Sequence, residues 1–350
     1  MNTLLIIGAD GWLGNAIQQE INKVFLDSVD IKQIIMHQKD KKVEVNKFNK
    51  NLIRDLKLHT IYGDFLIQET FNELNNSLKK KNIKNLFVIV TLGIIHPTKY
   101  NEFKKINFNA IKKIYRICSN YNLIKFTYIS SNSPFGINSQ KIPFNESSGY
   151  KAFGGYGKSK MMAEKFLLKN GDKNIVTILR APWFHGINMP LRQKKFLISS
   201  SKSKFPLIFL GRNIRSIVNV KDLAIASLVV TSEKRKYQIY WISENNKSMS
   251  KIIEIIKNAA YKNGYAKRLR INFNLYLPPG FSSFFFIVDM LLQKLKIYNM
   301  YIHVFSEIGQ DIFVDNSRYL SEFSHKHKFT NLEQSIFMEL EEAFDLNNKK

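Results

Sequence analysis

Short apolar runs alternate with segments of helical periodicity through the first half of the 350-residue chain. Apolar runs of this length, separated by helical segments, are typical of strands buried on both faces of a parallel sheet. Their regular alternation predicts an α/β fold with a doubly wound sheet of the Rossmann type. The predicted strands lie at residues 3–8, 33–36, 61–64, 86–92, 125–130, 175–179 and 237–243.

The regular alternation breaks after residue 182, where a segment rich in loop-forming residues begins. A strand and a helix return near residue 215, and a last strand follows them. We therefore expect a nucleotide-binding domain and a smaller substrate-binding part. The first comprises residues 1–182 and is completed by about 215–243, and the second comprises 183–214 and 244–350.

Three glycines follow the first predicted strand directly and lead into a helix. Gly8 permits a tight turn, Gly11 lets the backbone approach a pyrophosphate, and Gly14 lets the helix pack on the strand. The first turn of that helix, which includes Trp12 and Leu13, offers free N–H groups to phosphates. The loop therefore predicts a dinucleotide site, although its spacing differs from the commoner G-x-G-x-x-G.

The second predicted strand ends without an acidic residue. In NAD sites, an acid at this place binds the 2′-hydroxyl of the adenine ribose. Lys39 stands there instead and could meet a 2′-phosphate, so NADP is favoured over NAD. The alternative is an ordinary solvated turn.

Tyr156 and Lys160 lie four residues apart at the start of a predicted helix and share one face. A free tyrosine has a pKa of about 10, and a positive neighbour favours its phenolate form. We therefore expect Lys160 to help Tyr156 act as a base. Ser131 follows a predicted strand, at the sheet edge where ligands bind in such folds. The alternative for the pair alone is a surface contact.

The chain carries a formal net charge of +25, spread along its length and mostly due to lysine. An anionic substrate or an anionic membrane surface would suit this charge. No nucleic-acid-binding motif is present, so we expect no nucleic-acid partner. The single cysteine, Cys118, has no partner for a disulfide and belongs to no metal-binding motif. We expect a cytoplasmic protein without a metal site.

The segment 277–295 is unusually apolar and is interrupted by Asp289. It is shorter than the ~20 apolar residues that a membrane-spanning helix needs. A helix packed within the substrate-binding part is one interpretation. The other is a helix that lies on an anionic membrane, which would place the protein peripherally at the inner membrane face.

Further short motifs accompany the glycine loop and the Tyr156/Lys160 pair along the chain. They are Gly63-Asp64, Asn107 within a helix, the run Ser130-Ser131-Asn132-Ser133-Pro134-Phe135-Gly136, residues 180–186 and residues 215–222. With these motifs the chain resembles the extended short-chain dehydrogenase/reductase superfamily, in its NAD(P)-dependent epimerase/dehydratase branch. The similar 3β-hydroxysteroid dehydrogenase-like branch shares most of the same motifs.

The resemblance implies a role for each matching residue. Catalysis would fall to Tyr156, Lys160 and Ser131. Substrate binding would fall to Ser131, Asn132, Arg192 and Arg215. Cofactor binding would involve Gly8, Gly11, Trp12, Leu13, Gly14, Lys39, Asp64, Phe65, Leu92, Gly93, Asn107, Tyr156 and Lys160.

The resemblance implies an enzyme that acts on a nucleotide-diphosphate sugar, a precursor of surface polysaccharide or glycoconjugate, through a keto-sugar. Dehydratases of the family carry an Asp-Glu pair where this chain has Asn132 and Ser133, which favours an epimerase or a ketoreductase. One alternative is an oxidoreductase of a lipidic alcohol, resembling the steroid dehydrogenases. A minor one is a non-catalytic NADP(H)-binding redox sensor. Family members often form homodimers, here through helices at 101–121 and 158–168.

Overall fold

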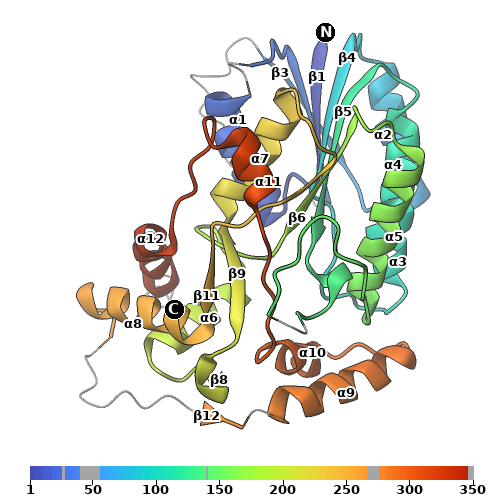
Figure 1. Cartoon of the computed structure of the whole chain (residues 1–350). Helices are drawn as coiled ribbons and strands as arrows, with labels where there is room; N and C mark the ends of the chain where they lie inside the picture. Colours follow the sequence, from blue (N-terminus) through green and yellow to red (C-terminus); the bar gives the residue numbers. More distant parts are fainter. Residues whose placement is uncertain (26–27, 40–55, 139–140, 267–275, 279, 346–350) are drawn as a thin grey trace.

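A seven-stranded sheet runs through the upper part of the molecule (Figure 1). The computed structural model describes residues 1–25, 28–39, 56–138, 141–266, 276–278 and 280–345. The strand order is β10-β6-β5-β4-β1-β2-β3, and every pairing is parallel. The strands are β1 (Asn2–Ile7), β2 (Gln33–Gln38), β3 (Lys57–Tyr62), β4 (Asn85–Val90), β5 (Leu123–Ser131), β6 (Val176–Ala181) and β10 (Ile239–Trp241).

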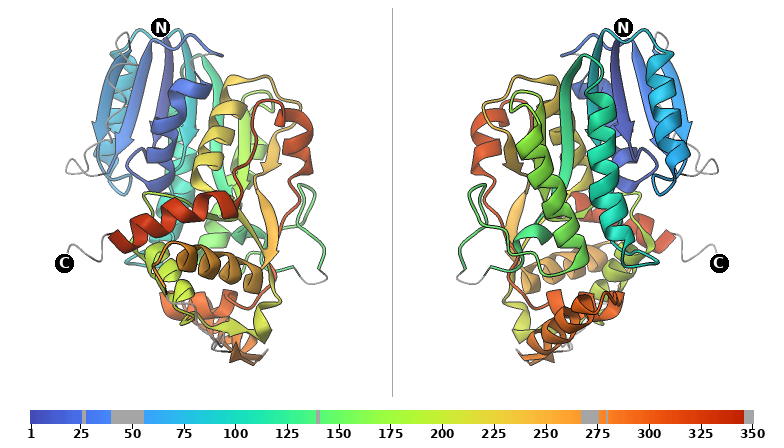
Figure 2. Two further views of the ribbon diagram at one scale, coloured as in Figure 1. Left: turned by 90° about the vertical axis from the view of Figure 1, so that its left-hand side faces the viewer. Right: turned by 90° about the vertical axis from the view of Figure 1, so that its right-hand side faces the viewer.

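Helices cover both faces of this sheet, as the alternating pattern predicted. In β1, Leu4 and Ile6 belong to one buried cluster, whereas Leu5 and Ile7 belong to the other. Helices α1 (Trp12–Val24), α7 (Val220–Ser232) and α11 (Ser317–Phe323) pack on the first face. On the second face, where α4 and α5 lie side by side (Figure 2), are α2 (Gln68–Lys79), α3 (Glu102–Lys104), the π-helical segment η2 (Lys105–Ala110), α4 (Ile111–Cys118) and α5 (Gly155–Asn170).

Below the carboxyl ends of the strands lies the rest of the chain (Figure 1). A three-stranded sheet, in the order β11-β9-β7, is covered by α6, α8 and α12, which share a buried cluster of their own. These elements are β7 (Trp183–His185), α6 (Leu191–Ser201), β9 (Ile214–Asn219), β11 (Asn245–Ser248), α8 (Met249–Lys262) and α12 (Leu332–Asp345).

The lowest end of the molecule in Figure 1 is built from short strands and two helices. A parallel pair joins β8 to β12, and α9 packs against α10. These elements are β8 (Leu207–Ile208), η4 (Phe209–Gly211), β12 (Tyr276–Leu277), α9 (Gly280–Lys294) and α10 (Met300–Glu307), and one more short turn, η3 (Ser133–Phe135), follows β5.

The structure confirms the predicted doubly wound α/β fold, with small differences at the ends of elements. The helix expected at 101–121 is π-helical between Lys105 and Ala110. Of the stretch 61–64, only Ile61 and Tyr62 belong to a strand, because β3 begins earlier, at Lys57, and ends before Gly63, whose φ is +153°. Within the substrate-binding part as predicted, residues 267–275, Pro279 and 346–350 lie outside the described residues. In the part of the chain that the structure describes, no helix is long and apolar enough to cross a membrane.

Candidate active site

Helix α5 starts on glycines whose places no larger residue could take. A Cβ at Gly155 would lie 2.5 Å from the ring of Phe103. A Cβ at Gly157 would lie 2.5 Å from the carbonyl oxygen of Ser133, just after β5. The glycines therefore let α5 approach both α3 and the end of β5 closely, and this approach brings Tyr156 to the carboxyl edge of the sheet.

The phenol of Tyr156 meets the hydroxyl of Ser131, the last residue of β5. Burial raises the pKa of Tyr156 to about 12, and the charge of Glu307 acts in the same direction. The hydrogen bond from Ser131 acts against this rise and lowers the pKa. In the chain alone the phenol is therefore neutral near pH 7 and carries a proton that it can donate to an oxygen.

Lys160 is buried one helical turn after Tyr156. Its Nζ donates to the carbonyl oxygen of Ile129 at 2.9 Å and would lie 3.1 Å from a Cβ at Gly93. Burial lowers the pKa of Lys160 to about 7, although the charge of Glu164 opposes the effect. We expected Lys160 to lower the pKa of Tyr156, but burial is the largest influence on both groups and the pKa of Tyr156 rises instead.

Asn107 lies in η2 and links two parts of the site. Its side-chain amide donates to the carbonyl oxygen of Ile94 at 3.0 Å and to the hydroxyl of Ser159 at 3.1 Å. Its side-chain oxygen accepts the backbone N–H of Ile94 at 2.8 Å. Asn107 thus fixes the loop after β4 against α5, and its π-helical segment has the local geometry that often marks functional sites.

A buried ion pair that we did not predict from the sequence holds α5 on the sheet. Glu164 follows Lys160 by one turn, and the Nε and Nη2 of Arg180 on β6 donate to it at 3.1 and 2.8 Å. The hydroxyls of Ser130 and Tyr150 also donate to Glu164. The carboxylate is therefore fully engaged, and it fixes the orientation of the helix that carries Tyr156.

The glycine loop has the shape that a dinucleotide needs. Gly8 has a φ of +83°, and a Cβ there would lie 2.8 Å from the hydroxyl of Thr91. A Cβ at Gly14 would lie 2.1 Å from the carbonyl oxygen of Gly8. No side chain caps the N-terminus of α1, which starts after Gly11. The loop and the uncapped helix terminus therefore fit the pyrophosphate of NAD(P).

The remaining predicted cofactor residues surround this loop. Trp12 donates from its indole to the carbonyl oxygen of Ile187 at 2.8 Å, while Leu13 is buried in the core. Leu92 follows β4, and its backbone nitrogen would lie 3.2 Å from a Cβ at Gly8. At the outer edge, Lys39 pairs with Asp64 at 2.8 Å, and Phe65 packs on His37 with 4.2 Å between ring centroids.

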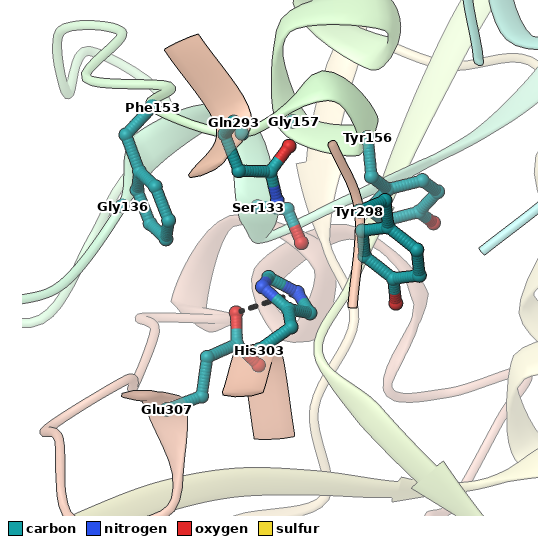
Figure 3. Close-up of a pocket in the computed structure, with 10 residues that line it drawn as sticks. Ser133, Gly136, Phe153, Tyr156, Gly157, Gln293, Tyr298, His303 and Glu307 are labelled. Atoms are coloured by element: carbon teal, nitrogen blue, oxygen red, sulfur yellow. Dashed lines mark ion pairs between the residues drawn. The ribbon is translucent and has the colours of Figure 1, made fainter. Parts of the chain in front are cut away.

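The C-terminal helices α9 and α10 complete a pocket at Tyr156, and sequence reasoning missed this wall (Figure 3). The side chain of Gln293 accepts the backbone N–H of Gly155 at 3.0 Å, directly at the start of α5. The pocket encloses about 330 Å³, open solvent at its mouth included. It is lined by Ser133, Gly136, Phe153, Gly154, Tyr156, Gly157, Gln293, Tyr298, His303 and Glu307.

His303 is the most constrained titratable group in this wall. It lies 2.8 Å from a carboxylate oxygen of Asp289 and 3.8 Å from one of Glu307. Burial alone would lower the pKa of His303, but the hydrogen bond to Asp289 and the charge of Glu307 outweigh burial and raise it. The spacing of Asp289 and Gln293, which interrupts an apolar run at i and i+4, was the sequence signal for this wall.

Arg192 lies at the start of α6 and reaches across to the loop after β4. Its guanidinium donates to Nε2 of His96 at 2.7 Å, so that Nε2 accepts and Nδ1 carries the ring proton. The Nδ1 atom in turn lies 2.7 Å from the hydroxyl of Tyr298. Burial and the charge of Arg192 lower the pKa of His96 to about 4, so its ring is neutral. The hydrogen-bonded series Arg192–His96–Tyr298 thus connects α6 to the pocket.

The other two predicted substrate residues, Asn132 and Arg215, lie on different parts of the chain. Asn132 follows Ser131 directly, and its backbone N–H donates to the carbonyl oxygen of Ala181 at 3.1 Å. Arg215 on β9 donates to the backbone carbonyl of Glu307 at 3.2 Å. Arg215 therefore lies at the end of α10, whose Glu307 lines the pocket, and Asn132 is the neighbour of Ser131 in the chain.

Known proteins share this architecture along the whole chain. A dTDP-glucose 4,6-dehydratase from Bacillus anthracis in complex with NAD is 16% identical, covers 100% of this chain and 98% of its own, and has a TM-score of 0.69. MoeE5 in complex with UDP-glucuronic acid and NAD is 17% identical, covers 99% of this chain and 100% of its own, and has a TM-score of 0.67. At such identities the likeness concerns the fold alone.

Sequence comparison identifies the family more directly. The protein y4nL of Sinorhizobium fredii, described as uncharacterized, is 33% identical over 229 residues. This match spans 64% of each of the two proteins. The sequence profile of the NAD dependent epimerase/dehydratase family matches residues 4–243, from β1 through β10. The chain therefore belongs to the NAD dependent epimerase/dehydratase family.

Proposed function

We propose that the protein is an NAD(P)-dependent epimerase or ketoreductase of a nucleotide-diphosphate sugar. The observation that carries this proposal is the position of Tyr156, which lines the pocket, interacts with Ser131 at the end of β5 and lies one helical turn before the buried Lys160. Membership of the family supports it, as does the likeness to MoeE5, whose solved complex holds UDP-glucuronic acid and NAD.

Tyr156 would exchange a proton with the sugar oxygen that becomes a carbonyl. Ser131, which already contacts the phenol, would hydrogen-bond the same oxygen and fix its position. A nicotinamide held by the glycine loop would supply the hydride chemistry at the sugar carbon. In its charged form, Lys160 would make removal of the hydroxyl proton by the Tyr156 phenolate easier, because a nearby cation favours that anion.

The residues after Ser131 favour epimerisation or reduction over dehydration. Elimination of water needs an acid and a base next to the keto-sugar. Asn132 and Ser133 occupy those positions, and the hydroxyl of Ser133 lies 3.3 Å from that of Ser131. Neither side chain acts as a strong acid.

Two arginines would bind the diphosphate. A guanidinium binds phosphate oxygens in a bidentate manner. Arg192, at the start of α6, donates to His96, and Arg215 donates to the backbone carbonyl of Glu307 at the end of α10. Replacing Arg215 with Ala should weaken the binding of a nucleotide sugar by about 10-fold or more, because hydrogen bonds between charged groups contribute about 1.5–3 kcal/mol. Unchanged nucleotide-sugar affinity would contradict the assignment.

For the cofactor we propose a preference for NADP that depends on Lys39. The described residues at the end of β2 include no acid, and the Lys39 side chain is 67% exposed. Its ion pair with Asp64 leaves further N–H groups to donate to a 2′-phosphate. Lys39→Asp should shift the ratio of NADP to NAD affinity toward NAD. An unaltered ratio in fluorescence titrations would refute the preference.

An oxidoreductase of a lipidic alcohol is the second candidate, and one observation favours it. The outer face of α9 exposes large apolar side chains, while its inner face lines the pocket. The homodimer through the helices at 101–121 and 158–168 and the cytoplasmic location stay predictions. The dimer can be tested by light scattering of the purified protein.

The proposed function can be tested with a panel of nucleotide sugars and lipidic alcohols. The purified protein would be incubated with NAD or NADP and each substrate, and products would be identified by mass and stereochemistry. An epimer or a reduced sugar is expected. Tyr156→Phe should lower turnover by about 10²–10⁴-fold, the usual contribution of a general acid–base, while cofactor binding persists. Turnover of lipidic alcohols alone would establish the second candidate instead.

A further inference from the structure

Helix α9 buries polar residues and exposes one apolar stripe, while its other apolar side chains are half-buried. The buried residues of the helix are Ser282, Asp289 and Gln293. Phe284 and Leu291, in contrast, are 63% and 52% exposed. A surface helix normally buries its apolar stripe. The exposure of the α9 stripe therefore suggests a binding partner that covers it. We call the exposed stripe the α9–α10 face; it consists of Phe284, Ile287, Leu291 and Leu295, with Tyr301 and Val304 on α10.

The inward polar side of α9 already has defined partners. Asp289 binds His303, Gln293 binds the start of α5, and the hydroxyl of Ser282 donates to the carbonyl oxygen of Phe305 at 3.0 Å. These contacts fix the rotation of the helix about its axis. The α9–α10 face therefore cannot turn toward the core without breaking these contacts. Its exposure is a consequence of the fold.

A neighbouring turn exposes two more apolar side chains in a strained backbone. Phe209 and Leu210 have φ angles of 47° and 59°, a region that bulky residues rarely adopt, and both are about half exposed. The turn follows β8, which pairs with β12 just before α9. Strain of this kind persists where the surrounding structure imposes it, often at sites that bind a partner.

Most charges around this end of the molecule are positive. In the described parts of 200–213 and 276–307 the acidic residues are Asp289, which is buried and bound to His303, and Glu307, the last residue of α10, which lies 3.8 Å from His303. The exposed charged residues there are all basic: Lys202, Lys204, Arg212, Lys294 and Lys296. An apolar stripe with a basic margin matches the interface of an anionic bilayer, where each nearby lysine or arginine adds to binding.

We propose that the α9–α10 face docks the protein peripherally on an anionic lipid bilayer. The apolar stripe enters the boundary between headgroups and acyl chains, and Lys294, Lys296 and Arg212 contact the lipid phosphates. A second copy of the chain is a poorer occupant, since a symmetric contact would bring the same lysines of both copies together. Because Gln293 ties α9 to the start of α5, the docked protein holds its catalytic pocket next to the lipid surface.

Vesicle flotation of the full chain tests this proposal independently of the enzymatic function. The wild type should float with vesicles containing about one third phosphatidylglycerol and stay at the bottom of the gradient with pure phosphatidylcholine vesicles. Binding should weaken in 1 M salt, where the Debye length falls from about 10 Å to about 3 Å. Failure to float with the anionic vesicles at low salt would overturn the proposal.

Matched variants locate the contact. Phe284→Gln combined with Leu291→Gln should lower the partition coefficient by about 10-fold or more, because burying each large apolar side chain favours transfer from water by at least that factor. Phe337→Gln combined with Met338→Gln, at two exposed apolar positions on α12, should leave it unchanged. Equal loss in both pairs would place the contact elsewhere. Thermal unfolding checks that the variants are folded.

Charge-reversal variants and a tryptophan fluorescence reporter complete the test. Lys294→Glu with Lys296→Glu should abolish flotation, whereas Lys79→Glu with Lys80→Glu on α2 should not. In Phe284→Trp the added emission should shift to the blue with anionic vesicles, and in Met338→Trp it should not. If instead the wild type is a dimer that the Phe284/Leu291 variant dissociates, and neither floats, the face is an interface between two copies and the membrane proposal is wrong.

Discussion

Helices α7 and α9 are both apolar, and both contain one buried aspartate that contacts a histidine, but they face opposite ways. On α7, Leu223 and Leu228 are buried against the sheet, and Asp222 lies 3.3 Å from His327. On α9, Phe284 and Leu291 are exposed, and the buried Asp289 lies 2.8 Å from His303, which lines the pocket. Apolar content therefore does not fix which side of a helix packs inward. The contacts of its few polar residues determine the inward side. These contacts also distinguish α7, which packs in the core, from α9, which forms a wall of the pocket.

The largest difference between the two helices should appear in stability. Leu228→Ala should lower the free energy of unfolding by about 2–5 kcal/mol, because it leaves a cavity in the core. Leu291→Ala, on the exposed side of α9, should change it by less than about 0.5 kcal/mol. Denaturant titrations followed by circular dichroism would measure both. Equal effects would mean that the two helices share one structural role.

The inner side of α9 can be tested through Gln293. Gln293→Ala would leave the buried N–H of Gly155 without its acceptor, which should cost about 1–3 kcal/mol of stability. Because that N–H begins helix α5, we also expect a lower kcat/KM for the substrate that the panel identifies. Lys294→Ala, at the next and exposed position, is the matched control. A Gln293 variant that matches this control in both measurements would show that the contact is dispensable.

A smaller effect concerns the pH dependence of stability. The pKa of His303 is raised in the folded protein, so its contribution is fully present below the unfolded value of about 6.5. That contribution is lost as pH rises from there through the folded pKa. The slope from this group is at most about 1.4 kcal/mol per pH unit. His303→Gln should reduce the pH dependence of the free energy of unfolding over this range. His325→Gln, at an exposed position, should leave that pH dependence unchanged.

The sequence predicted the nucleotide-binding half well because its signals are local. The glycine loop, the strand ending in Ser131 and the helix starting at Tyr156 each depend on residues close together in the chain. The parallel sheet then brings their ends to one edge without further information. The family motifs added the expected order of these elements and the roles of their residues.

The wall made by α9 and α10 could not be predicted in the same way. Gln293 contacts Gly155, a residue far away in sequence, and no local pattern specifies that pairing. The apolar residues of α9 extend almost around the helix, so periodicity did not define its inner side. The rise in the pKa of Tyr156 could not be predicted from the sequence either, because it depends on burial that only the assembled pocket provides.

The position of β10 at the edge of the large sheet affects how the chain can fold during synthesis. Its partner β6 is complete at Ala181, but β10 begins only at Ile239. On the ribosome, the whole segment between them must emerge before the edge of β6 is covered. Until then an apolar strand edge stays open to wrong pairing. The burial of Trp241 in β10 would report by fluorescence the moment at which that edge closes.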